Sequence, residues 1–204
     1  SRTKEIQDKF NIPYLVALEL EQKDLNDEEI KIFLNPTRYD FHDPFKLPDM
    51  KEAVDRILKA MENKENIVIY GDYDADGITS TTILKRYMKD RNIEVGTYIP
   101  NRLDEGYGLN EEAIREIAKK GYTLMITVDC GITAKKEVEL AKTLGLDVII
   151  TDHHEVPESL PKAIAVVDAK RKDSKYPFNQ LAGCGVAFKL VQALSRRLNI
   201  PDNE

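Results

Sequence analysis

The sequence has no tryptophan, only two cysteines and only three histidines among its 204 residues. Cys130 and Cys184 stand alone, without the paired spacing of a zinc site, and two unpaired cysteines fit a reducing cytoplasm. No apolar run approaches the length of a transmembrane helix, and residues 1–30 are too charged for a signal peptide. These absences predict a cytoplasmic protein with no membrane partner.

The sequence also lacks an excess of positive charge. Its 30 Lys and Arg residues stand against 36 Asp and Glu residues, which leaves a net charge of −6. Proteins that bind nucleic acid draw much of their affinity from Lys and Arg contacts to phosphates, and no ladder of aromatic residues for stacking bases is evident. The densest basic stretch, Lys170-Arg171-Lys172, is predicted to be a solvated loop. Composition alone therefore does not indicate DNA binding.

Acidic residues are concentrated where a short apolar run ends. Residues 66–70 have the composition of a strand buried on both faces, and Asp72, Asp74 and Asp76 follow it directly. In an extended segment these three carboxylates share one face, where they repel each other unless a cation lies among them. The same spacing opens a calcium EF-hand, but that motif needs a Glu where this chain has Ile83 and a helix where it has a strand. We therefore expect a divalent-metal site of another kind.

Two further β-forming runs end in residues with similar chemistry. Residues 124–128 lead to Asp129, and residues 148–151 lead to Asp152-His153-His154. The segments between the runs have helical patterns, over residues 77–92, 110–120 and 133–144. Alternating strands and helices predict an α/β fold with a doubly wound, mainly parallel sheet flanked by helices, whose ligands bind beyond the carboxyl ends of the strands. All three groups are then expected to face one crevice.

The candidate ligands are mostly carboxylates, and this donor set suits Mn²⁺ or Mg²⁺ better than Zn²⁺. The adjacent His153 and His154 point to opposite sides of an extended segment, so that one can bind a metal while the other faces a substrate. Bound divalent ions lower the pKa of a bound water and neutralise phosphate groups. The residues by themselves predict a metal-dependent phosphoesterase.

The sequence also contains longer motifs that resemble those of a known family. Gly71-Asp72-Tyr73-Asp74-Ala75-Asp76-Gly77, Val128-Asp129-Cys130-Gly131-Ile132 and Asp152-His153-His154 resemble the motifs of the DHH phosphoesterase superfamily, and within it those of the RecJ family. Residues 99–102, 106–109 and 181–190 are also similar to that family. The resemblance covers nearly the whole chain.

The resemblance implies two metal ions in the full-length protein, held by residues from all three motifs: Asp74, Asp76, Asp129 as a bridge, and His153. Tyr70 stands where several relatives have a ligand histidine, so Asp72 is a further candidate ligand.

The remaining residues of the third motif are implied to act on the ligands and the substrate. Asp152 is expected to orient a ligand, and His154 to contact the scissile phosphate. Asp168-Ala169 stands where the family commonly has Asn-Pro, and we expect Asp168 to be structural.

The activity that the resemblance implies is 5′ to 3′ hydrolysis of single-stranded DNA to 5′-mononucleotides, in DNA recombination and repair. Single-stranded DNA is then the main partner, with a single-strand-binding protein and a recombination helicase as further partners. Two alternatives have the same fold. Phosphoesterases of pyrophosphate, cyclic dinucleotides or very short oligonucleotides share the acids, whereas a non-catalytic replication scaffold is expected to have lost them.

Two domains are expected. Residues 1–60 form an N-terminal helical extension, with helices over residues 27–34 and 50–61, and residues 61–204 form the DHH phosphoesterase domain. The family's later motif, with one more metal-binding Asp, does not appear in the sequence. We therefore expect a fragment truncated before that motif, with weak metal binding and doubtful activity in isolation.

Overall fold

The computed structural model describes residues 1–37, 40–101 and 106–200, and its contacts divide the chain into two compact units, Ser1–His42 and Asp43–Glu204. The described part of the first unit forms the helices α1 (Arg2–Phe10), α2 (Tyr14–Gln22) and α3 (Asp27–Leu34). Its small core consists of Ile6, Ala17, Leu20 and Ile30.

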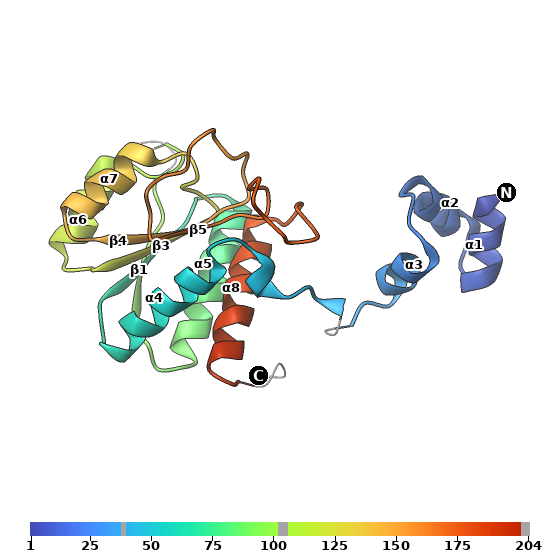
Figure 1. Cartoon of the computed structure of the whole chain (residues 1–204), viewed down its shortest axis with the longest axis horizontal. Helices are drawn as coiled ribbons and strands as arrows, with labels where there is room; N and C mark the ends of the chain where they lie inside the picture. Colours follow the sequence, from blue (N-terminus) through green and yellow to red (C-terminus); the bar gives the residue numbers. More distant parts are fainter. Residues whose placement is uncertain (38–39, 102–105, 201–204) are drawn as a thin grey trace. The chain divides into compact units, whose positions relative to one another are not determined.

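The second unit is built on a five-stranded parallel sheet with the strand order β2-β1-β3-β4-β5 (Figure 1). The strands are β1 (Ile67–Tyr70), β2 (Val95–Tyr98), β3 (Leu124–Val128), β4 (Asp147–Thr151) and β5 (Ala165–Val167). Every residue of β1 and β3 is buried, because helices cover both faces of the sheet, and this is why both strands appear in the sequence as unbroken apolar runs. The predicted parallel α/β fold is confirmed.

Helices form a layer on each face of the sheet (Figure 1). The helices α4 (Met50–Glu62), α5 (Ala75–Lys89) and α8 (Gly183–Arg197) lie on one face, and α6 (Glu111–Lys119) and α7 (Lys135–Thr143) lie on the other. A separate apolar core fills the space between each helical layer and the sheet. A short 3₁₀ helix, η2 (Pro44–Lys46), precedes α4. The sheet is therefore doubly wound, as predicted.

The compact unit that contains the sheet begins at Asp43, earlier than the boundary at residue 60 expected from the sequence. The helix α4 belongs with the sheet because its apolar stripe, Met50, Ala53, Val54, Ile57 and Ala60, is buried. The backbone N–H of Val166 in β5 also donates a hydrogen bond of 3.0 Å to Asp49, the residue before α4. The predicted helix over residues 50–61 is present, but it is part of the core of the second unit. No helix in the described part of the chain is long and apolar enough to cross a membrane.

Candidate metal centre

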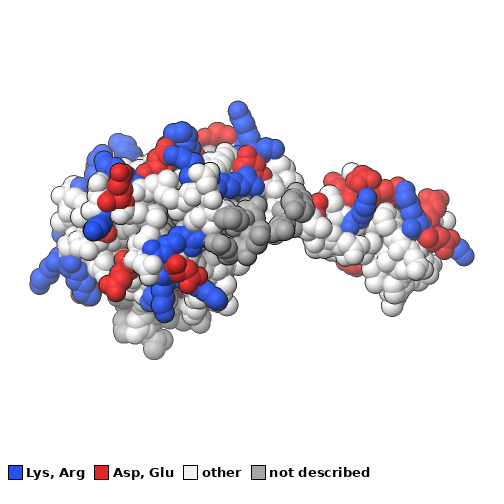
Figure 2. Space-filling view, turned by 90° about the horizontal axis from the view of Figure 1, so that it is seen from below, with Lys and Arg blue, Asp and Glu red and all other residues white. Residues whose placement is uncertain are grey.

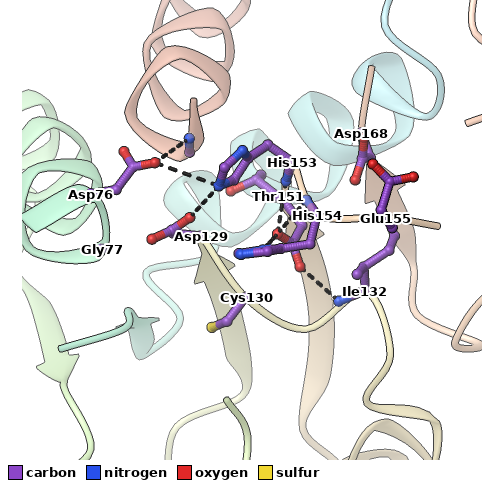
Figure 3. A network of polar contacts seen from close by, with 12 residues as sticks. Asp76, Gly77, Asp129, Cys130, Ile132, Thr151, His153, His154, Glu155 and Asp168 are labelled. Carbon is purple, nitrogen blue, oxygen red and sulfur yellow. Dashed lines mark hydrogen bonds and ion pairs between the residues drawn. The ribbon is translucent and has the colours of Figure 1, made fainter. Parts of the chain in front are cut away.

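The three predicted groups of acids and histidines meet at the carboxyl ends of the central strands (Figure 3). The side chain of Asp74 caps α5 by accepting a hydrogen bond of 2.9 Å from Gly77 N. Asp76 lies in the first turn of the same helix, Asp129 follows β3, and His153 follows β4. Because neighbouring parallel strands end at the same edge of a sheet, their terminal residues converge although they are distant in sequence.

The distances between the side chains are short enough for shared ions. Nε2 of His153 lies 3.0 Å from Oδ1 of Asp129 and 3.6 Å from Oδ2 of Asp76. Among the described residues, two sets of three side chains place one ligand atom each within 4.8 Å of the others: Asp129, His153 and His154, and Asp72, Asp74 and Asp129. Asp129 belongs to both sets, which is the geometry that a bridging ligand needs.

Asp129 is the most perturbed acid of the centre. Its side chain is buried, and its backbone has a left-handed φ of 61°. Oδ1 makes no hydrogen bond, although Nε2 of His153 lies 3.0 Å away. Burial, together with the charges of Asp76 and Asp74, raises the pKa of Asp129 to about 8. Buried polar atoms in proteins almost always form a hydrogen bond or bind an ion, so a buried oxygen that does neither indicates a missing partner.

Asp72 has the same property. Its side chain is buried, its Oδ1 has no hydrogen-bond partner, and burial raises its pKa above the ordinary value. Two buried carboxylate oxygens that make no hydrogen bond, together with a nearby imidazole, match the hard, mainly oxygen donor set of Mn²⁺ or Mg²⁺. The residues present therefore fit the ions that the sequence predicts.

Asp76 is held by the backbone of another helix. Oδ2 of Asp76 accepts a hydrogen bond of 2.7 Å from Gly183 N, and Oδ1 accepts one of 2.7 Å from Cys184 N, both in the first turn of α8. Burial alone would raise the pKa of Asp76, but these N–H groups hold it below the ordinary value. The glycine-rich start of α8 thus binds a carboxylate of the centre through its backbone N–H groups.

Asp152 and His154 form a pair beside the ligands (Figure 3). Oδ1 of Asp152 lies 2.7 Å from Nδ1 of His154, and Oδ2 accepts a hydrogen bond of 2.9 Å from Ile132 N. Burial would raise the pKa of Asp152, but the contact with His154 holds it below the ordinary value, and the same contact raises the pKa of His154. Asp152 therefore fixes the orientation of the His154 imidazole, and its Oδ1 also accepts a hydrogen bond of 2.7 Å from the backbone N–H of the candidate ligand His153.

Two tyrosines near the centre were given no role from the sequence. The hydroxyl of Tyr107 lies 3.2 Å from Nε2 of His154 and 3.3 Å from the carbonyl oxygen of Asp129. Tyr70, which stands where several relatives have a histidine, donates a hydrogen bond of 3.0 Å to the carbonyl of Gly108 and so anchors the segment that carries Tyr107. In the sequence, only the similarity of residues 106–109 to the family indicated that Tyr107 has a role. Arg102, in another similar motif, lies outside the described residues.

Asp168 and the basic stretch that follows it lie apart from the ligand sets. Asp168 is fully buried, and burial raises its pKa to about 7. Arg171 is not part of a solvated loop, because its side chain is only 8% exposed and forms ion pairs of 2.6 Å with Asp49 and 2.7 Å with Asp173. Lys172 is exposed, so the prediction holds for that residue and is wrong for Arg171.

Comparison with known sequences agrees with the motifs. A family model described as "DHH family, N-terminal domain" matches residues 66–204. The single-stranded-DNA-specific exonuclease RecJ of Bacillus subtilis is 48% identical over 194 residues, which cover 95% of this chain and 25% of that protein. The protein of the same name from Thermus thermophilus is 39% identical over 155 residues, or 76% of this chain and 23% of that protein. The chain thus spans about a quarter of the length of these relatives.

Solved structures also match. A structure of exonuclease RecJ bound to manganese superimposes with a TM-score of 0.70 at 38% identity, over 77% of this chain and 40% of the other. RecJ of Thermus thermophilus in complex with Mn²⁺ gives a TM-score of 0.77 at 30% identity, over 99% of this chain and 28% of the other.

Proposed function

The chain belongs to the DHH family, and from this we propose that it forms the metal-binding core of an exonuclease that degrades single-stranded DNA from the 5′ end in recombination and repair. The proposal depends on the position of Asp129, whose carboxylate belongs to both sets of potential ligands and has a buried oxygen that makes no hydrogen bond. The names of the relatives from Bacillus subtilis and Thermus thermophilus support the choice of single-stranded DNA as substrate.

The proposed cofactor is Mn²⁺ or Mg²⁺. The residues that would hold two ions are those that meet at the ends of β1, β3 and β4: Asp72, Asp74, Asp76, Asp129 and His153. When bound, the ions would supply an activated water and neutralise the charge of the phosphate. The similar structures of RecJ with bound manganese support this assignment.

The residues of the chain supply orientation and a proton. Asp152 raises the pKa of His154, which favours the protonated imidazole, and this form can donate a proton to the leaving oxygen of the scissile phosphate. Asp152 prevents rotation of the imidazole, and Tyr107 contacts its other nitrogen. Water would then attack the phosphorus and release one proton to the solvent. The bond from phosphorus to the 3′ oxygen of the terminal nucleotide would break, that oxygen would take the proton of His154, and a 5′-mononucleotide would be released.

The proposed DNA contacts are concentrated at the metal centre. On the face in Figure 2, the coloured Lys and Arg side chains are interspersed with Asp and Glu, which is not the broad basic surface of a protein that binds DNA through phosphates alone. Bound ions would reverse the negative field of the acids locally. A single-strand-binding protein and a recombination helicase are proposed as further partners in the cytoplasm, and co-purification with each would test them.

The test compares substrates of the full-length protein with Mn²⁺ present: 5′-labelled single-stranded DNA, the matching duplex, pyrophosphate and a cyclic dinucleotide. We expect mononucleotides to be released from single-stranded DNA and none of the other substrates to be hydrolysed. We expect Asp129→Asn to abolish this release. Hydrolysis of pyrophosphate or the cyclic dinucleotide in preference to DNA would assign the site to a small-molecule phosphoesterase instead.

A further inference from the structure

The first turn of α8 touches two acids of the centre that come from different elements. Its N–H groups at Gly183 and Cys184 each donate a hydrogen bond of 2.7 Å to Asp76, which belongs to α5. The N–H groups of a first helical turn have no partner within the helix, and the helix dipole favours a negative charge there. Both oxygens of Asp76 are therefore fixed by the backbone of α8.

Gly183 brings the same turn against Asp129. A Cβ atom at Gly183 would lie only 2.7 Å from Cβ and Cγ of Asp129, and nearer still to its Oδ1. Asp129 is buried, and its backbone lies in the left-handed region. Any side chain at position 183 must therefore displace either Asp129 or the start of α8.

Gly185, two residues further along, is in a different environment. A Cβ atom there would have Cδ2 of Leu181 as its nearest neighbour, at 3.3 Å, and that atom is the end of a flexible side chain. Substitution by alanine improves helix propensity to a similar extent at both glycines. The two positions therefore form a matched pair that differs in the contact with Asp129.

We propose that Gly183 is a positioning residue of the divalent-metal centre: because it has no side chain, the backbone of α8 can hold Asp76 and leave Asp129 in place at the same time. This inference rests on the proposed function in one respect, since it takes the ion at Asp76 and Asp129 to be a divalent cation. It adds a role for α8, which contributes no ligand but sets the separation of two ligands from α5 and β3.

The first experiment is a calorimetric titration with Mn²⁺ of the unchanged chain, Gly183→Ala and Gly185→Ala. We expect Gly183→Ala to weaken Mn²⁺ binding by about tenfold or more, as loss of residues that orient ligands typically does, and Gly185→Ala to bind as the unchanged chain does. Equal affinities of the two variants would overturn the proposal. If the unchanged chain binds no Mn²⁺, the proposed function fails, and the second experiment decides the role of Gly183 separately.

The second experiment is a double-mutant cycle on the melting temperature, without metal. Asp129→Gly removes every side-chain atom that a methyl group at position 183 would meet, including Cβ, and glycine tolerates the left-handed backbone at this position. We expect Gly183→Ala to lower the melting temperature clearly in the unchanged chain and much less in the Asp129→Gly background, because the two changes share one contact. An equal loss in both backgrounds, or failure to fold in both, would show that the methyl group acts on α8 alone and would overturn the proposal.

Discussion

Nε2 of His153 lies 3.0 Å from Oδ1 of Asp129, which connects the carboxyl end of β4 to that of β3. Without an ion, this contact joins two groups. One is a buried acid with a raised pKa, and the other is the Nε2 atom of an imidazole, which can take part in only one hydrogen bond. Both groups are good ligands for a divalent ion when Asp129 is ionised. Metal binding and proton release at Asp129 are therefore coupled, and this coupling can be measured.

The first prediction concerns the charge of Asp129. Asparagine tolerates the left-handed backbone at this position, so Asp129→Asn is expected to keep the fold while removing the ligand charge. Addition of Mn²⁺ should raise the melting temperature of the unchanged chain and leave that of Asp129→Asn unchanged. Asp90→Asn, at an exposed residue, is the control and should respond as the unchanged chain does. Stabilisation of Asp129→Asn by Mn²⁺ would remove Asp129 from the ligands.

The second prediction concerns pH in the presence of a chelator. The pKa of Asp129 is about 8 in the folded chain against an ordinary 3.8, so the folded state binds this proton more tightly than the unfolded state. The protonated form of Asp129 therefore stabilises the folded chain. This stabilisation is fully present below about pH 4 and is lost as pH rises through 8. The pKa of Asp168 is raised to about 7, so this residue also lowers the free energy of unfolding as pH rises.

Urea denaturation at pH 5 to 8 with a chelator is the measurement. The free energy of unfolding should fall over this range, and the fall should be shallower in Asp129→Asn. Excess Mn²⁺ should restore stability most strongly at pH 8, because the ion no longer competes with the proton. Identical slopes in the two proteins would contradict the pKa assigned to Asp129.

The third prediction separates the two histidines. His153→Ala is expected to weaken Mn²⁺ binding, since His153 lies within 3.6 Å of both Asp76 and Asp129. His154→Ala should retain most of the Mn²⁺ affinity and lower kcat by about 10²-fold or more, as removal of a general acid does. Calorimetry and a mononucleotide-release assay on the same preparations measure both. A reversed pattern would assign His154 to the metal, which its distance from Asp129 and His153 also permits.

The sequence predicted the parts of the fold that have a strong local signal. The buried strands β1, β3 and β4 are uniform apolar runs, and α6 begins after Asn110, whose side chain accepts a hydrogen bond from Ala113 N as expected of an N-cap. The strands β2 and β5 were missed because they are edge strands. The strand β2 is only partly buried and contains Gly96, and β5 has only three residues, so neither has a clear pattern.

The candidate centre was predictable as far as it depends on strand ends. Parallel topology alone brings Asp76, Asp129 and His153 to one edge of the sheet. The contact of α8 with Asp76 was not predictable, because it joins residues 107 positions apart through backbone N–H groups, which have no side-chain signature. The role of Arg171 was hidden for a related reason: a basic residue between two lysines looks solvated until its partner Asp49, 122 positions away, is known.

The last prediction concerns this buried arginine. Arg171 contacts Asp49, Asp173 and the carbonyl oxygen of Val166, and so joins the start of α4 to β5 and to the loop that follows. Asp49 and Asp173 are partly exposed, so their charges can be solvated when the arginine is removed, but the hydrogen bonds and the packing of the buried side chain are lost. Arg171→Ala should therefore lower the free energy of unfolding by about 2 kcal/mol. Lys172→Ala, one residue further along and exposed, is the matched control and should change it by less than about 0.5 kcal/mol. Urea denaturation of both variants is the measurement. If both were as stable as the unchanged chain and Arg171→Ala only weakened binding to single-stranded DNA, the stretch would be a DNA-binding loop and Arg171 would have no structural role.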